Sequence, residues 1–357
     1  MKTSVAILCS VAALSGFFEA ATARGALLLV HENGHLAVVK TTPNGLQDIL
    51  TLEGLNVVYG ESKRAFAFLS KKRKSDGWQL DLLDEGTEAI TSRAVAIDDV
   101  LMELAGPAKD MMLNDNAAYF VTFGSAGFRF NQLSLADGSV RTFSLPNDVS
   151  NPRVVDFGGI PLILEWEGYR VWKFDPAAAS LQQLVTADDV DETTRRSEQR
   201  VRGQRTGFFA SFVMVPGVGV FRLSRLGDLQ QVLNPDLTRI AGPPVTLQKA
   251  GRAGQVLRVF AGVYRGTAAI GVVREWNGRK GVTYMDPLGS MIRRQAPLTA
   301  GAVLDSIFPT PDDSILYVDS ETAAVNDIDL GTFAVTPLCK VPADGANLAR
   351  ILSVTPP

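Results

Sequence analysis

The chain is poor in the side chains that most often carry out chemistry. It has 357 residues but only two histidines and two cysteines, too few histidines for a convincing base beside a Ser or Cys nucleophile. It also lacks an excess of charge, since 35 basic and 38 acidic side chains leave a net charge of −3. Such a balance gives no long-range field for nucleic acid or an anionic membrane, so we expect neither partner.

Residues 1–23 are typical of a secretory signal peptide. Lys2 precedes an apolar run from Ser4 to Phe18, and Ala21-Thr22-Ala23 offers the small residues that a signal peptidase selects. The run is shorter than the roughly 20 residues that span a bilayer as a helix. We therefore predict a secreted or periplasmic protein with no membrane span. Removal of the signal would leave Cys339 as the only thiol, which excludes an internal disulfide.

The rest of the chain repeats one pattern. An alternating strand runs into a turn containing Asp, usually with Gly close behind, as in Leu133-Ser134-Leu135-Ala136-Asp137-Gly138. Asp accepts hydrogen bonds from the backbone ahead of it and Gly permits positive φ, so both suit tight hairpins. Seven such units follow one another at a mean spacing of about 48 residues. Their anchors are Thr42, Asp84, Asp137, Asp175, Arg225, Asp286 and Asp329.

Each unit also has an apolar strand upstream of its alternating one, such as Ala65–Leu69 and, in the fifth unit, Phe208–Val215. Runs of this kind suit strands that are covered on both faces, as when one small sheet is stacked between two others. Four strands per unit, a period in the forties and no strong helical periodicity predict an all-β fold, a β-propeller. Seven four-stranded blades in one domain over residues 24–357 fit best, with six or eight blades as alternatives.

The two ends of the chain suggest how the propeller closes. The first unit begins directly with its apolar strand and lacks the preceding strand that Leu55–Tyr59 or Arg153–Phe157 supplies elsewhere. The segment Leu348–Val354 is a strand without a unit of its own. We predict that it completes the first blade as the innermost strand, so that both ends of the chain lie in one blade.

Residues 309–335 carry a resemblance to a known family. The segment Pro309-Thr310-Pro311-Asp312-Asp313 precedes Leu316-Tyr317-Val318, and Val325-Asn326-Asp327-Ile328-Asp329 follows. These segments resemble the Pro-Asp-Gly, Leu-Tyr-Val and Val-x-x-Ile-Asp landmarks of YVTN-type β-propeller repeats, with Asp313 where that family usually has Gly. The resemblance implies a seven-bladed propeller. Because the family includes a few enzymes and many proteins of unknown role, it supports a fold more than a function.

His31-Glu32-Asn33-Gly34-His35 matches H-E-x-x-H, the zinc metalloprotease pattern. That chemistry needs a helix, because only there do residues four apart lie on one face. Here apolar strands flank the motif, and Asn33-Gly34 is a strong two-residue hairpin signal. We therefore predict that Glu32 pairs with His35 and His31 with Leu36, which sends the two imidazoles to opposite faces. A zinc site is the less favoured alternative, and no metal site is predicted.

Two similar segments, Glu165-Trp166-Glu167-Gly168 and Glu275-Trp276-Asn277-Gly278, form an internal pair. Each lies between the apolar and the alternating strand of its unit, a connection that points to the face where a propeller channel usually opens. The candidate ligand-binding residues at a channel rim are therefore Trp166, Trp276, Glu165 and Glu275. The alternative is that each Trp covers its own hairpin or a neighbouring blade, because aromatic side chains more often pack than recognise a ligand.

The sequence contains no specific catalytic motif. It lacks a Gly-x-Ser-x-Gly elbow, a P-loop and a dinucleotide fingerprint, and we assign no catalytic residue. It favours an exported, monomeric binding or scaffold propeller that presents one face to a protein, peptide or glycan. The alternative is a lactonase- or lyase-like enzyme, as some YVTN-type relatives imply, with a small-molecule site in the channel. Scattered carboxylates there could hold Ca²⁺, and no other cofactor is predicted.

Overall fold

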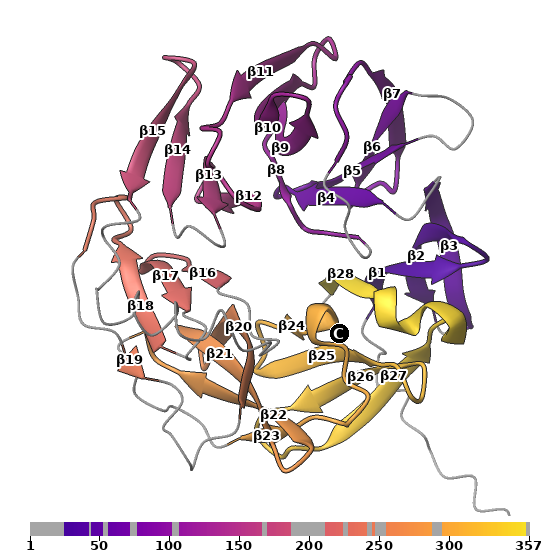
Figure 1. Cartoon of the computed structure of the whole chain (residues 1–357). Coiled ribbons are helices and arrows are strands. Elements are labelled where there is room, and N and C mark those ends of the chain that lie inside the picture. The colour runs from indigo at the N-terminus through magenta and orange to yellow at the C-terminus, as the bar shows by residue number, and fades with distance from the viewer. Residues whose placement is uncertain are drawn as a thin grey trace, which may run out of the picture.

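A computed structural model describes residues 25–42, 44–52, 56–71, 77–101, 107–165, 170–186, 211–223, 228–240, 245–246, 255–287 and 295–354. Over these ranges the chain forms seven four-stranded antiparallel sheets. The sheets stand side by side around a central axis as the blades of a β-propeller (Figure 1). The predicted all-β fold and the predicted number of seven blades are both confirmed.

The blades follow chain order, and the strands of each are given from the innermost outward. Blade one comprises β28 (Arg350–Val354), β1 (Ala26–Glu32), β2 (His35–Thr42) and β3 (Gly45–Leu52). Blade two comprises β4 (Val57–Glu61), β5 (Ala65–Lys71), β6 (Trp78–Asp84) and β7 (Ile90–Val95). Blade three comprises β8 (Met111–Leu113), β9 (Ala117–Gly124), β10 (Gly127–Ser134) and β11 (Val140–Ser144). Blade four comprises β12 (Pro152–Phe157), β13 (Ile160–Glu165), β14 (Val171–Asp175) and β15 (Ser180–Val185).

The last three blades have the same antiparallel order. Blade five comprises β16 (Ser211–Val215), β17 (Gly219–Leu223), β18 (Asp228–Leu233) and β19 (Val245–Thr246). Blade six comprises β20 (Gln255–Tyr264), β21 (Thr267–Trp276), β22 (Arg279–Met285) and β23 (Ala296–Pro297). Blade seven comprises β24 (Phe308–Pro309), β25 (Ser314–Asp319), β26 (Ala324–Asp329) and β27 (Val335–Lys340). Two short 3-10 helices, η2 (Leu304–Ser306) and η3 (Ala343–Leu348), precede β24 and β28.

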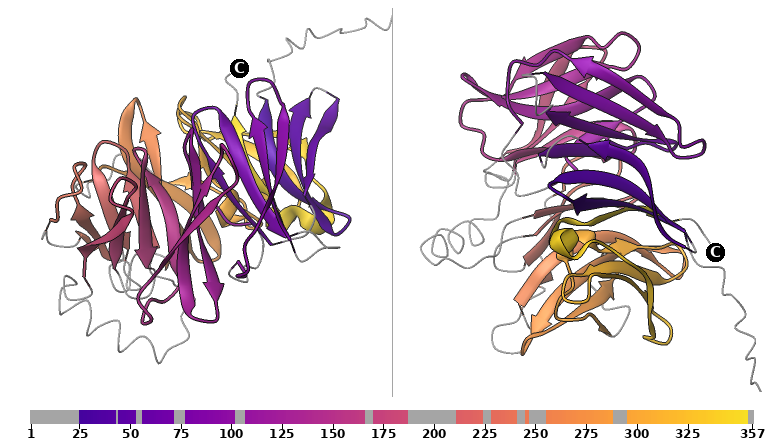
Figure 2. Two further views of the ribbon diagram at one scale, coloured as in Figure 1. Left: turned by 90° about the horizontal axis from the view of Figure 1, so that it is seen from above. Right: turned by 90° about the vertical axis from the view of Figure 1, so that its right-hand side faces the viewer.

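The C-terminal strand closes the ring, as the sequence predicts. β28 pairs antiparallel with β1, with Ala26 opposite Val354 and Leu29 opposite Arg350. Figure 2 shows the yellow C-terminal elements beside the indigo strands of blade one. One blade therefore contains strands from both ends of the chain, and their backbone hydrogen bonds hold the ring together.

Apolar side chains fill the contacts between neighbouring blades. The described residues form seven buried clusters, each of which joins one blade to the next around the ring. Tyr284 of β22 and Tyr317 of β25, for example, are fully buried between blades six and seven. The second strand of a blade is the most enclosed, and all six residues of β25 are buried. The core is thus a ring of interfaces rather than one central mass.

Aspartates make the turns between the third and fourth strands of blades two, three, four and seven, as predicted. Asp329 accepts the backbone N–H of Thr332 at 2.6 Å and its hydroxyl at 2.9 Å. Asp137 accepts the corresponding groups of Ser139 at 3.0 and 2.8 Å. The backbone hydrogen bond from Ser139, helped by the serine hydroxyls, lowers the pKa of Asp137 to about 2. These turns therefore depend on ionised carboxylates.

Blade five departs from the predicted register. The apolar run assigned to its second strand, Phe208–Val215, instead ends in β16, the innermost strand, and the second strand is β17. The predicted anchor Arg225 lies outside the described residues. The Asp turn of this blade is at Asp236, whose carboxylate accepts the Thr238 N–H at 3.0 Å. The sequence of this innermost strand resembles that of a fully covered strand, because its channel-facing side includes apolar Met214.

The H-E-x-x-H segment is a hairpin, which confirms the prediction. Glu32 lies opposite His35 and His31 opposite Leu36. Asn33 and Gly34 have φ values of 50° and 79°, the positive pair that a type I′ turn requires. Cross-strand partners share a face of a sheet, so His31 and His35 lie on opposite faces and cannot share a metal ion.

Several predictions fall on residues that the structure does not describe. The predicted signal peptide 1–23 lies outside the described residues, as do Trp166 and Glu167. Within the described ranges, no helix is long and apolar enough to cross a membrane.

Candidate functional site: the central channel

Two adjoining cavities lie along the axis of the ring. The first, here called the mouth cavity, has a volume of about 580 Å³ and lies where the innermost strands begin. The second, the far cavity, has a volume of about 570 Å³ and reaches the turns where β12 and β16 end. Glu61, Lys109 and Ala261 line both, so the two are parts of one channel. Each volume falls in the range of about 300–1,000 Å³ that is typical of small-molecule pockets.

The innermost strands place charged side chains at the mouth. Arg153, Arg258 and Arg350 come from β12, β20 and β28, each in the first half of its strand. Asp110 immediately precedes β8, and Asp305 lies in η2 just before β24. The innermost strands of a propeller run in the same direction around the axis. Residues at equivalent positions of different blades therefore meet in one ring.

Two of these arginines share a single carboxylate. Arg350 Nη2 lies 3.5 Å from Asp305 Oδ2, and Arg258 Nη1 lies 3.7 Å from Asp305 Oδ1. The Asp305 side chain is 70% exposed, whereas those of Arg258 and Arg350 are 29% and 11% exposed. Enclosure by the channel walls lowers the pKa of Arg258, and the negative charge of Asp305 opposes that shift. The two positive charges are thus more enclosed than the negative charge that they share.

The remaining charges of the mouth cavity are arranged in pairs. Arg153 forms an ion pair with Asp110, and Lys109 Nζ lies 2.5 Å from Glu61 Oε1. Enclosure raises the pKa of the Asp110 carboxyl, and the Arg153 charge opposes the shift. Burial also raises the pKa of the Tyr59 hydroxyl, which therefore stays protonated at neutral pH. The described lining has four basic against three acidic side chains, so the mouth has an excess of positive charge.

The three described members of the predicted ligand-binding set, Glu165, Glu275 and Trp276, are not brought together. Glu165 ends β13 in blade four and is fully buried. Its carboxylate accepts the Ser150 N–H at 2.7 Å and a hydrogen bond from Arg170 Nε at 2.5 Å. Glu275 and Trp276 lie at the end of β21 in blade six, where the Trp276 side chain is 57% exposed.

None of the described members of that set lines either channel cavity. Their ligand-binding role stays a prediction.

No metal site is evident in the part of the chain that the structure describes. No group of three or more His, Cys, Asp or Glu side chains is placed to hold an ion there. The mouth carboxylates Glu61, Asp110 and Asp305 all contact basic side chains instead. Ca²⁺ binding stays a prediction.

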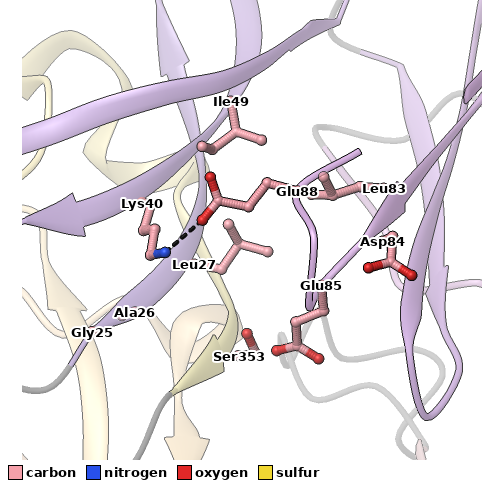
Figure 3. A pocket seen from close by; sticks show the side chains of 10 residues that line it. All are labelled: Gly25, Ala26, Leu27, Lys40, Ile49, Leu83, Asp84, Glu85, Glu88 and Ser353. Carbon is pink, nitrogen blue, oxygen red and sulfur yellow. Dashed lines mark hydrogen bonds and ion pairs between the residues drawn. The ribbon is translucent and has the colours of Figure 1, made fainter. Parts of the chain in front are cut away.

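A smaller pocket lies between blades one and two (Figure 3). Lys40 Nζ lies 2.5 Å from Glu88 Oε1 at its side, and Leu27 and Ser353 form part of its wall. Its volume of about 50 Å³ is room for a water molecule or two rather than for a substrate. The channel is therefore the stronger candidate site.

Sequence reasoning missed the three channel arginines, although a signal for them exists. Each begins the same short pattern in an innermost strand, an arginine followed by two apolar residues. The three copies are Arg153-Val154-Val155, Arg258-Val259-Phe260 and Arg350-Ile351-Leu352. A repeated charge at the start of an otherwise apolar strand indicates a side chain that faces an aqueous channel.

No model of a known protein family matches the chain, and no curated protein matches it in sequence. Solved structures do match. The β-propeller domain of the Trilobed protease from Pyrococcus furiosus, which has an open velcro topology, is 8% identical, with a TM-score of 0.52 over 87% of this chain and 88% of that one. YCF48 from Cyanidioschyzon merolae is 12% identical, with a TM-score of 0.53 over 82% and 88%. A streptogramin B lyase structure is 11% identical, with a TM-score of 0.48 over 81% and 83%.

At these identities the likeness shows the fold alone. The chain is a seven-bladed β-propeller protein, and propellers of this kind serve both as enzymes and as binding proteins. The resemblance to YVTN-type repeats agrees with this fold, but no family match extends it, and membership of that family stays a prediction.

Proposed function

We propose that the protein is a binding propeller whose channel mouth holds an anionic group of its ligand. One observation carries the proposal: Arg258 and Arg350, from two different blades, share the exposed carboxylate of Asp305 at one end of a cavity of about 580 Å³. Guanidinium groups are well suited to carboxylates and phosphates, which they can hold with two parallel hydrogen bonds.

The surroundings of these arginines favour an anion from solution. Their charges are partly enclosed, and attraction between charges is stronger in such a setting than in bulk water. Asp305 is mostly exposed, so solvent weakens its compensating effect. Tyr59 lines the same cavity, and its protonated hydroxyl is a neutral donor. An entering carboxylate or phosphate would therefore gain more here than at an ordinary surface arginine.

We also propose that the partner carries an acidic group and that the protein is exported. An acidic group can be offered by a small molecule or by a peptide, and either fits the predicted role of a binding or scaffold module. Export rests on the signal-like residues 1–23, and the monomeric state stays a sequence prediction.

The channel lining supports binding better than catalysis. Among the described residues that line the two cavities there is no His, Cys, Ser or Thr, the side chains that most often serve as nucleophiles or bases. The carboxylates of the mouth cavity contact basic neighbours such as Arg153 and Lys109, and Asp156 of the far cavity accepts the Gly159 N–H. A lactonase- or lyase-like activity therefore stays the alternative, without an observation that favours it.

Calorimetric titration with succinate and with inorganic phosphate at low ionic strength tests the proposal. We expect both anions to bind, and added salt to weaken them because it screens the attraction. Arg258→Gln should lower affinity at least tenfold, whereas Asp305→Asn should raise it by removing the competing carboxylate. Arg141→Gln, an exposed arginine of the outermost strand β11, is the matched control and should change nothing. Equal binding by wild type and Arg258→Gln would refute the proposal, as would no binding of either anion.

A further inference from the structure

We infer that the ligand is amphipathic, with its anionic group at the mouth and an apolar body that extends into the far cavity. This inference rests on the proposed anion site and adds a chemical class to it. Its basis is the change in lining along one channel, from arginines at one end to aliphatic and thioether side chains at the other.

The far cavity is largely apolar. Its wall includes Met111, Val155, Ile160, Met214 and Pro216 from blades three, four and five. Val155, Ile160 and Met214 are half-buried: they pack against the cluster between blades four and five and also line the cavity. Thioether side chains adapt well to irregular apolar partners. This part of the channel therefore favours contact with hydrocarbon.

The polar groups of the far cavity already have partners within the protein. Lys109 and Glu61 form an ion pair with each other at 2.5 Å. Asp156 accepts the Gly159 backbone N–H at 2.8 Å in the turn that ends β12. Because these polar groups are already paired, the apolar side chains determine which part of a ligand binds at this end of the channel.

Strand geometry links the charged and apolar ends. Alternate residues of a strand point to the same side, about 6.6 Å apart along the chain. Arg153 and Val155 are such a pair in β12, and one lines the mouth cavity while the other lines the far cavity. In blade six Ala261 of β20 lines both cavities, so the strand that carries Arg258 also continues from one cavity to the other. A ligand held by its acid group at the arginines would therefore lay its tail against the apolar residues.

The test uses a series of carboxylates on the whole protein. Butanoate, octanoate and decanoate are titrated at equal ionic strength, with 1-decanol as a probe that lacks the charge and succinate as one that lacks the tail. We expect roughly fourfold tighter binding for each methylene added, as about 0.8 kcal/mol per buried CH₂ gives. Decanol and succinate should each bind at least tenfold more weakly than decanoate.

Substitutions in the mouth cavity and in the far cavity test the two parts of the channel separately. Val155→Thr combined with Met214→Gln should flatten the dependence on chain length and leave succinate binding unchanged. Arg258→Gln should instead weaken every carboxylate and keep the chain-length dependence. Val335→Thr, at an exposed position of the outermost strand β27, is the control for the polar substitution, and a thermal melt of each variant checks folding.

The outcomes distinguish the inference from the proposed function. If succinate and phosphate bind through Arg258 but affinity is flat across the carboxylate series, the amphipathic ligand is wrong and the anion site stands. If decanol and decanoate bind equally and Arg258→Gln changes neither, the channel is apolar and both ideas are wrong. If no probe binds, both are wrong as well.

Discussion

The interfaces between blades and the surface of the channel are built from the same sheets but differ in the side chains that they contain. Between blades, apolar side chains such as Tyr284 and Tyr317 are fully enclosed, and seven such clusters hold the ring together. Along the axis, the innermost strands carry Arg153, Arg258 and Arg350 instead. Because the interfaces supply the stability, the channel side chains are free to be selected for binding.

Blade five shows where this distinction weakens. Its innermost strand β16 presents Met214 to the channel rather than a charge, so its pattern resembles that of an enclosed strand. The same feature caused the register error in the sequence prediction and provides part of the apolar wall of the far cavity. The blade that differs from the predicted repeat therefore also contributes to the apolar wall of the far cavity.

Removal of the closing strand should have the largest effect on this architecture. Deletion of residues 347–357 removes β28 and with it the hydrogen bonds to β1 and the contact of Leu352 with the cluster between blades one and two. We expect loss of the cooperative fold, measured as loss of a sharp thermal transition. Deletion of 355–357 alone is the control and should leave the transition unchanged. A protein without β28 that melts as sharply as the full chain would show that closure does not hold the ring.

A substitution in the interface between blades six and seven should have a smaller effect on stability, and it should stabilise the protein. Tyr284 is fully buried, and its hydroxyl has no hydrogen-bond partner among the described residues. Tyr284→Phe removes that unmet group and should raise the free energy of unfolding by about 1 kcal/mol. Tyr119 is also buried but its hydroxyl accepts a hydrogen bond from Gln132 at 3.4 Å, so Tyr119→Phe should not stabilise. Chemical denaturation of both variants makes the comparison, and equal effects would contradict it.

The smallest effect concerns the turns at the outer edge of the blades. The pKa of Asp137 is about 2 in the folded protein, below its ordinary value of 3.8, because Ser139 donates hydrogen bonds to the carboxylate. Its contribution is therefore complete above about pH 4 and is lost as the pH falls towards 2. Asp137→Asn keeps an acceptor but cannot titrate, so the stability difference between wild type and variant should shrink over that pH range. Thermal melts at several pH values measure it, and a constant difference would contradict the assignment.

Much of the fold follows from local pattern. Strand periodicity and Asp turns set the number of blades, and the positive φ values at Asn33 and Gly34 set the hairpin that separates His31 from His35. The prediction failed in blade five because apolar alternation does not tell a strand enclosed on both faces from one that borders an apolar channel. The candidate site was harder to predict, since local similarity selected Glu165, Glu275 and Trp276, none of which lines the channel.

The sequence by itself determined the strands, their turns and the closure of the ring, because each depends on residues that are neighbours along the chain or on an unpaired strand at its end. Only the tertiary structure decided which charges meet. Arg258 and Arg350 are separated by almost two blades of sequence, and they share Asp305 because the ring brings the starts of the innermost strands to one axis. Hydrophobic periodicity fixes which face of a strand is covered, whereas convergence at the channel depends on how seven sheets pack around it.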